Sequence, residues 1–176
     1  MVKSLIFLLF VISSFVGHTQ INNLDKMNGI AIFKFGENIS KFNKDLKLSM
    51  KGYGDNCNYY RYKGNQLNTL FKVPVKEVKL GYYKNRLWFI SIDFDSSIIG
   101  DNGNKYLISR LDGILGKGSF SYSSDNGKDW SEQWSTSKNV LQICKYKADL
   151  SNGQAPNTQI FLINKSLYEE YKLDAF

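Results

Sequence analysis

The fold is decided by residues 75–95, VKEVKLGYYKNRLWFISIDFD, in which apolar and polar residues alternate on both sides of a short polar connection. Such alternation predicts two antiparallel strands that each bury one face. Because the two apolar faces must coincide, we expect Tyr82 to lie opposite Trp88 and Leu80 opposite Ile90. This pairing leaves an odd number of residues between the strands, so it predicts a loop centred on residues 84–86.

The residues before this hairpin predict a strand, a helix and a short aromatic strand. Residues 30–35, IAIFKF, form an apolar run that ends at Gly36, as expected for a buried strand. Ser40 is the expected N-cap of the helix, and the aromatic strand is expected over residues 58–62. The apolar residues that would share one face of this helix are Ile39, Phe42 and Leu46.

The residues after the hairpin predict a second helix and then further strands. The segment from Gly100 to Gly103 interrupts the chain, and an amphipathic helix is expected to follow it and to stop at Gly116. The residues that indicate this helix are Tyr106, Leu107, Arg110, Leu111 and Leu115. Further strands are expected at residues 119–122, 129–135, 139–146 and 159–163, and a short helix from Ser166 to Tyr171.

Length and composition predict a single domain. The chain has 176 residues, of which 43% are hydrophobic and 22% charged, and its formal net charge is +7. A chain of this size can bury a self-sufficient core, and its sequence contains no proline-rich or glycine-rich linker. We therefore expect one α+β domain over residues 20–176, with an antiparallel sheet, two main helices and, in each half, a helix that precedes a set of strands.

Residues 1–19 have the composition of a secretory signal peptide. Lys3 precedes an apolar run over residues 5–12 that is too short to span a bilayer. Gly17 and Thr19 are the small residues before a cut that would leave Gln20 first, and the segment resembles the signal peptides of flavobacterial-type bacteria. These features predict a secreted or periplasmic protein with no stable membrane span after cleavage. An uncleaved N-terminal anchor is the alternative.

The mature chain is expected to contain no histidine, because the only one, His18, lies in the predicted signal peptide. This excludes a Ser-His-Asp triad, a Cys-His pair and a histidine-ligated zinc or copper site, and we expect neither a cofactor nor a metal. Removal of Lys3 reduces the 23 basic residues to 22 against 16 acidic ones. The basic residues form no block of five like charges, so nucleic acid is not an expected partner.

The two cysteines, Cys57 and Cys144, are candidates for a disulfide, because an even pair in an exported chain is often bridged. The alternative is two separate buried thiols that behave as small hydrophobic residues. Cys144 lies in an apolar strand pattern that fits this alternative. A catalytic thiol is not expected without a histidine to activate it.

Four neighbouring residues, Tyr59, Tyr60, Arg61 and Tyr62, are the candidate binding surface. Aromatic rings around a guanidinium group could stack against sugar rings or against a partner protein. The alternative is that these residues are the core and rim of a sheet.

Asp93 and Asp95 are the candidate catalytic pair. They stand two residues apart on one predicted strand, so their carboxylates share a face at a spacing of about 7 Å. Such a pair could act on a glycosidic bond or bind a hard cation. The alternative is a solvated strand end in which Lys79 lies diagonally opposite Asp93, and with it we expect both carboxylates to be exposed.

The segment from Ser123 to Trp130 resembles the Asp-box of sialidases and other β-propeller proteins. In that motif Asp125 and Gly127 would shape a hairpin turn on which Trp130 packs. The motif occurs once, and the chain is too short for the four or more blades of a propeller. The resemblance therefore implies a structural turn and not a sialidase.

The layout of the chain also resembles small exported α+β modules, such as β-lactamase-inhibitor-protein-like domains and envelope-assembly lipoproteins. The matching residues are Phe33, Lys34, Phe35 and Gly36, followed by the helix expected at Ser40. This resemblance implies a binding module with an open sheet face. The chain departs from the lipoproteins because it lacks a cysteine just after the apolar leader.

The sequence thus predicts an exported, non-enzymatic binding protein for a protein or glycan partner. The alternative function is a small carboxylate-dependent glycan hydrolase that uses Asp93 and Asp95. A pocket with polar groups around these two residues would favour the enzyme, and an aromatic sheet face would favour the binding protein.

Overall fold

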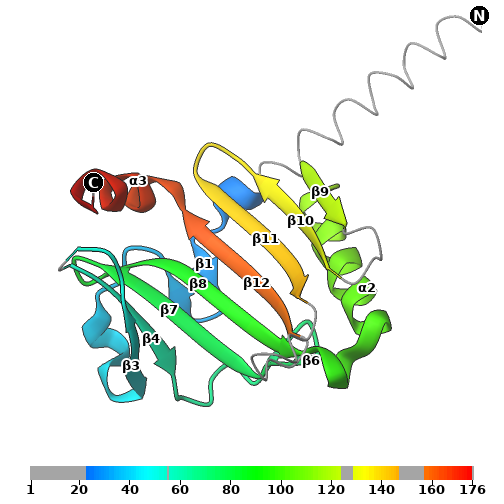
Figure 1. The fold of residues 1–176 in the computed structure, drawn as a ribbon, viewed down its shortest axis with the longest axis horizontal. Coiled ribbons are helices and arrows are strands. Elements are labelled where there is room, and N and C mark those ends of the chain that lie inside the picture. Colours follow the sequence, from blue (N-terminus) through cyan, green and yellow to red (C-terminus); the bar gives the residue numbers. More distant parts are fainter. Residues whose placement is uncertain (1–22, 55, 124–128, 147–156, 176) are drawn as a thin grey trace, which may run out of the picture.

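One eight-stranded antiparallel sheet forms the centre of the molecule (Figure 1). The computed structural model describes residues 23–175 except 55, 124–128 and 147–156. Across the sheet the strand order is β3 (Leu46–Lys51), β4 (Cys57–Tyr62), β7 (Glu77–Tyr83), β8 (Arg86–Asp95), β12 (Asn157–Asn164), β11 (Asn139–Tyr146), β10 (Trp130–Ser135) and β9 (Phe120–Ser123). The predicted α+β class with an antiparallel sheet is confirmed, although strands far outweigh helices.

The sheet consists of two four-stranded halves that follow one another in the sequence. Strands β3, β4, β7 and β8 form the first half, and β9 to β12 form the second. The last strand of each half pairs with the last strand of the other, and Ile92 of β8 faces Ile160 of β12 near the middle of this ladder. A helical segment precedes each set of strands, as the sequence predicted, but in the first half it is only a short 3-10 helix, η1 (Ile39–Asp45).

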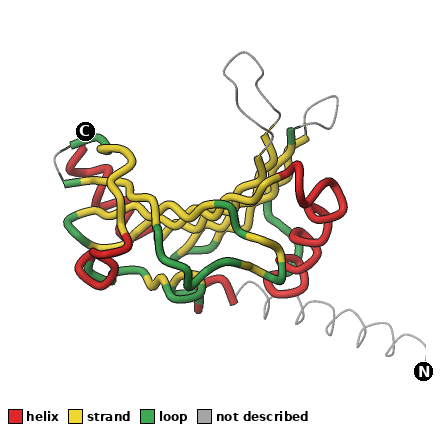
Figure 2. Tube along the Cα trace, turned by 90° about the horizontal axis from the view of Figure 1, so that it is seen from below, coloured by secondary structure: helices red, strands yellow, loops and turns green. Residues whose placement is uncertain are grey.

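The main core lies between one face of the sheet and the helix α2 (Ser96–Leu115). We call this the inner face. Leu107, Leu111 and Leu115 of α2 are buried against apolar side chains of the central strands, among them Ile90 and Leu162. The opposite, outer face is covered at one end by the helix α3 (Lys165–Ala175). Figure 2 shows the curved sheet between α2, which lies mainly below it, and α3, which lies above its other end.

The predicted three-residue loop of the β7–β8 hairpin is wrong. Lys84 and Asn85 form a two-residue turn in which both residues have positive φ, 47° and 62°, the backbone that suits a tight hairpin. Leu80 does face Ile90, but Tyr82 faces Leu87. A β-bulge restores the register, because Gly81 pairs with Phe89 and leaves Trp88 as the extra residue of β8.

The bulge sends Trp88 to the outer face. Leu87 belongs to the main core, whereas Trp88 packs in a second buried cluster on the outer face with Cys57, Tyr83, Leu167 and Tyr171. Gly81 lies opposite the bulge, where an added Cβ would stand 2.9 Å from Phe89 Cβ and 3.0 Å from Tyr59 Cε1. Glycine is therefore required at position 81 by the close approach of two aromatic side chains.

The segment before the sheet differs from the predicted strand and helix. Residues 30–35 do not form one strand, because β1 (Gly29–Ile30) turns back at Ala31, with φ 52°, to pair with β2 (Phe33–Lys34). The N-cap of η1 is Asn38, whose side chain accepts a hydrogen bond from the Ser40 amide. Ser40 is thus inside the helix, and Leu46, expected on the helical face, begins β3. A second short pair joins β5 (Thr69–Leu70) to β6 (Val73–Pro74).

The expectation of two main helices is not confirmed, because η1 replaces the first of them. α2 begins earlier than predicted, at Ser96, and is kinked at Gly100, which has φ 57° and ψ −168°. The four later strands and the terminal helix lie where the sequence placed them, within a few residues. In the described ranges of the chain, none of the helices has both the length and the apolar character needed to cross a membrane.

The predicted disulfide is also wrong. No disulfide joins Cys57 in β4 to Cys144 in β11, and both side chains are buried. Three strands, β7, β8 and β12, lie between them, which corresponds to about 19 Å at the usual strand spacing of about 4.8 Å. A bridge requires Cα atoms within about 7 Å. The alternative of two separate buried thiols is therefore the correct one.

Replacement of Gly81 should destabilise the protein. In G81A the new methyl group meets Phe89 and Tyr59, and we expect a loss of about 1–3 kcal/mol in the free energy of unfolding. The matched control is G113A in α2, where nothing lies within 4 Å of the added Cβ, and there alanine should stabilise by about 0.5–1 kcal/mol. Chemical denaturation of both variants tests this, and equal effects would contradict the role of Gly81.

Both thiols should react only after unfolding. Without a reductant, titration with a thiol reagent should find two free thiols per chain in denaturant and almost none in the native protein, because both side chains are buried. Two equivalents of rapid reaction in the native state, or none in denaturant, would contradict this assignment.

Candidate functional site

The outer face of the sheet has an aromatic half and a charged half. The aromatic half lies beside α3, where the Trp88 indole stacks on Tyr168 with ring centroids 5.4 Å apart and on Tyr171 at 5.5 Å. The charged half lies next to the aromatic half, on strands β4, β7 and β8. The aromatic residues of the outer face are Tyr59, Tyr83, Trp88, Phe89, Phe161, Tyr168 and Tyr171.

Helix α3 is anchored so that its two tyrosines meet the sheet. The Asn164 side chain accepts a hydrogen bond from the Leu167 amide and caps the first turn. Tyr168 and Tyr171 stand three residues apart, so they share one helical face. At the other end of α3, Asp174 pairs with Lys84 Nζ at 2.6 Å and accepts a hydrogen bond from the Tyr83 hydroxyl. These contacts hold α3 against the β7–β8 turn.

An open pocket of about 240 Å³ lies between α3 and the β3–β4 hairpin. Tyr59 and Tyr171 line the pocket next to the sheet, and Met50 and Tyr53 line its rim with 58% and 75% of their surface exposed. The Tyr53 amide donates a hydrogen bond of 3.2 Å to the Tyr171 hydroxyl, which ties the rim to α3. The pocket therefore combines aromatic walls with an accessible mouth. We call it the Tyr59 pocket; Lys51 and Gly52 complete its lining.

The aromatic half is uncharged near neutral pH. Burial raises the pKa of the Cys57 thiol and outweighs the hydrogen bonds of Trp88 and Tyr59, which act in the opposite direction. Burial also raises the pKa of Tyr59, as does the neighbouring Cys57. Gly52 leaves room for this thiol, since an added Cβ would stand 2.8 Å from Cys57 Sγ. The thiol is thus a packing group and is not activated as a nucleophile.

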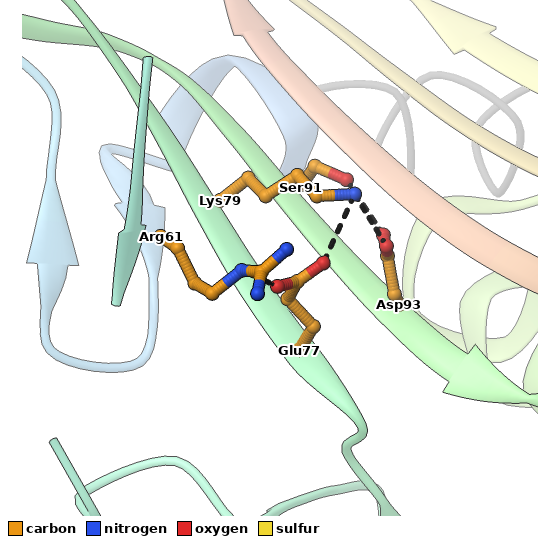
Figure 3. A network of polar contacts seen from close by, with 5 residues as sticks. All are labelled: Arg61, Glu77, Lys79, Ser91 and Asp93. Atoms are coloured by element: carbon orange, nitrogen blue, oxygen red, sulfur yellow. Dashed lines mark hydrogen bonds and ion pairs between the residues drawn. The ribbon is translucent and has the colours of Figure 1, made fainter. Parts of the chain in front are cut away.

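The charged half is a continuous network across β4, β7 and β8 (Figure 3). Lys79 Nζ lies 2.8 Å from Asp93 Oδ2 and 3.1 Å from Glu77 Oε2, and Glu77 also pairs with Arg61. The Ser91 hydroxyl donates to Asp93 Oδ1 at 3.0 Å. Burial lowers the pKa of Lys79, but the hydrogen bonds and charges of Asp93 and Glu77 outweigh it, so the pKa is raised and the ammonium group stays charged.

The two candidate carboxylates, Asp93 and Asp95, differ in burial and in their ion pairs. Asp93 was expected to be exposed, but it is 3% exposed because neighbouring side chains on the sheet face enclose its ion pair. Lys79 lies diagonally opposite Asp93, as the structural alternative predicted. Asp95 is half-buried and lies 3.9 Å from Lys76 Nζ. A pocket of about 130 Å³ is lined by Asp95, Lys76 and Ile98 but not by Asp93.

The four residues of the candidate binding surface do not share a face. Tyr59 and Arg61 lie on the outer face, whereas Tyr60 and Tyr62 point into the main core, because successive strand residues alternate. Tyr62 packs edge-on against Phe33 with centroids 5.0 Å apart. The strand is thus partly core and partly surface, and it contributes one aromatic ring to the Tyr59 pocket.

The Asp-box turn residues Asp125 and Gly127 lie outside the described residues. Trp130, which ends that motif, begins β10 and pairs with Ser123 of β9 and Lys145 of β11. Its indole packs against the main core. The signal peptide predicted for residues 1–19 also lies outside the described part of the chain.

Sequence reasoning missed most of the residues of the outer aromatic cluster and of the Tyr59 pocket. Trp88 was assigned to the inner face because strict alternation hides a bulge. Tyr168 and Tyr171 were given no binding role, although their spacing in a terminal helix is a visible signal of an aromatic helical face. Met50 and Tyr53 were missed with β3 itself, since the segment was assigned to a helix and its following loop.

Comparisons of the chain with protein-family models, curated proteins and solved structures give no match. Within the part of the chain that the structure describes, no three His, Cys, Asp or Glu side chains are grouped to hold a metal ion.

Asparagine substitutions should separate the roles of the two aspartates. D93N removes a charge-assisted contact from a buried network, and we expect a loss of about 1.5–3 kcal/mol in the free energy of unfolding at neutral pH. D95N is the comparison and should cost less, because the Asp95 side chain is 27% exposed and that of Asp93 is 5% exposed. Chemical denaturation measures both. Because the pKa of Lys79 is raised, its ammonium stays charged throughout the neutral range. Similar losses in both variants would refute the distinction.

Proposed function

We propose that this protein is a non-enzymatic binding protein, secreted or periplasmic, that holds a glycan or a protein partner in the Tyr59 pocket. The observation that carries this proposal is the open aromatic pocket, with exposed Met50 and Tyr53 at its mouth and Tyr59 and Tyr171 along its wall. Soluble proteins bury most large aromatic side chains, and exposed ones grouped around a concavity are typical of binding sites.

Two further features support a binding role. The charged network stands next to the aromatic half, and Arg61 is exposed two residues from Tyr59 on the same face. Aromatic and arginine side chains are the residues most enriched where proteins bind partners. The resemblance to β-lactamase-inhibitor-protein-like modules implies the same use of an open sheet face.

The alternative of a carboxylate hydrolase receives no support from the contacts of Asp93. A general acid needs a carboxyl group with room for a substrate beside it. Asp93 instead bonds to Lys79 and Ser91 and has little accessible surface. We therefore do not propose Asp93 and Asp95 as catalytic residues.

The test uses single alanine substitutions at the pocket and a matched tyrosine elsewhere on the same face. Y53A removes an exposed ring at the mouth, and Y59A removes a ring from the wall. The control is Y122A on β9, whose ring is also exposed, 53%, at the far end of the sheet. The mature chain and the three variants are applied to a glycan array and used to capture proteins from an envelope extract.

A glycan or a protein retained by the wild type should bind at least about tenfold more weakly to Y53A and Y59A, equivalent to about 1.4 kcal/mol each. Y122A should bind as the wild type does. Partners retained equally by all four proteins would place binding outside the Tyr59 pocket, and no retained partner in either assay would remove the basis of the proposal. Turnover of any bound glycan would refute a non-enzymatic role.

A further inference from the structure

On α2, β11 and β12, the row of apolar residues that faces the core ends in a polar residue. The three polar residues lie at the same end of the inner face. The rows are Leu115, Leu111, Leu107 and Asn104 on α2; Leu141, Ile143 and Lys145 on β11; and Leu162, Ile160 and Thr158 on β12. Positions that face a core normally carry apolar side chains. Three polar residues at one level therefore need an explanation beyond folding.

These polar residues lie together. Lys145 and Thr158 are paired in the β11–β12 ladder, and the Thr158 hydroxyl donates to Asn104 Oδ1 at 2.7 Å. Lys145 Nζ lies 2.7 Å from Asp101 Oδ1, one turn before Asn104 on α2. The pairing with Lys145 lowers the pKa of Asp101, so the carboxylate stays ionised.

Asn104 is 2% exposed, yet its Nδ2 has no hydrogen-bond partner among the described residues. A buried donor without an acceptor is destabilising, and native structures contain few of them. An apolar side chain at position 104 would avoid this loss. The amide is thus well placed to donate to a bound molecule.

Asn104 lines a pocket of about 290 Å³ between α2 and strands β10 and β11. Trp130 and Ile108 supply the apolar part of its lining, and Asp101, Asn104 and Lys145 supply the polar part together with Lys105. This combination of an aromatic surface and a few convergent polar groups is the usual composition of a small-molecule site.

We propose that this pocket is a second binding site, distinct from the Tyr59 pocket, and that it takes one neutral monosaccharide unit. Sugar hydroxyl groups both donate and accept, so they can satisfy the Asn104 amide and the Asp101 carboxylate at once. The Asp101 and Lys145 charges oppose each other at 2.7 Å, and Lys105 is exposed, so the inner part of the lining has no net charge to hold a carboxylate or phosphate. The C–H groups of a sugar ring form an apolar face that fits the Trp130 indole.

The pocket sits among residues 101–108, 130 and 145, whereas the Tyr59 pocket is formed by residues 50–53, 59 and 171. The two therefore use different strands and different helices. A failure at one site leaves the other untouched, and the two proposals are tested separately.

The experiment is a titration of the isotopically labelled mature chain, followed by NMR, with glucose, galactose, mannose and N-acetylglucosamine. At least one of these sugars should produce saturable shifts of the Trp130 indole N–H and the Asn104 amide. The Y59A variant should give the same shifts. The absence of saturable shifts with all four sugars, or shifts that centre on Tyr59, would overturn the proposal, as would equal binding of acetate or phosphate at Asn104.

The matched variant is N104L/T158V, which replaces both partners of a buried hydrogen bond with apolar groups of similar shape. Because both groups of this pair are replaced together, neither is left buried without the other, and sugar binding should weaken at least tenfold. N102L, at an exposed position of the same helix, is the control and should bind normally. Unchanged binding by N104L/T158V would refute the role of Asn104, and the wild-type titration remains decisive if this variant does not fold.

Discussion

The pairing of β8 with β12 is the constraint on which the rest of the molecule depends. It joins two sequential four-stranded sets into one sheet, and it places Ile92 and Ile160 at the centre of the main core. Each half alone would expose the inner face of its last strand and leave an unpaired edge there. The ladder also brings together residues separated by more than sixty positions in the chain, and non-local contacts of this kind slow folding.

The bulge at Trp88 determines which face of the sheet the aromatic residues of β8 occupy. At the bulge, two adjacent aromatic residues, Trp88 and Phe89, point to the outer side; after it, β8 follows the alternation that buries Ile90 and Ile92 against α2. This single inserted residue creates the surface on which α3 packs. Without α3 the Tyr59 pocket would lose the part of its wall that Tyr171 forms, so the shape of this pocket depends on the register of one hairpin.

The sequence predicted the strands of the second half well, because there each strand is apolar on alternate residues and bounded by turn residues. The prediction of secondary structure failed where one local residue pattern is compatible with two structures. The spacing of Ile39, Phe42 and Leu46 suits a helix, but the chain turns into a 3-10 helix and leaves Leu46 to pair with Tyr62. The bulge could not be predicted either, because regular alternation along β8 would place Trp88 and Ile90 on the same face of the sheet. For the candidate site, Tyr59 and Arg61 lie on the outer face but Tyr60 and Tyr62 do not, and Tyr171, which lines the Tyr59 pocket, comes from a helix more than a hundred residues away.

The irregular edge strand β3 has a consequence for how the chain behaves among its own copies. Leu48 pairs with Tyr60 and Met50 with Tyr59, so Ser49 is an extra residue that bends the outermost strand. Lys47 and Lys51 flank the exposed Leu48 and Met50. A straight, apolar edge would be a template on which another molecule could add its own strand. The bend and the two cations make this edge a poor template for strand addition, although Met50 remains exposed beside the Tyr59 pocket.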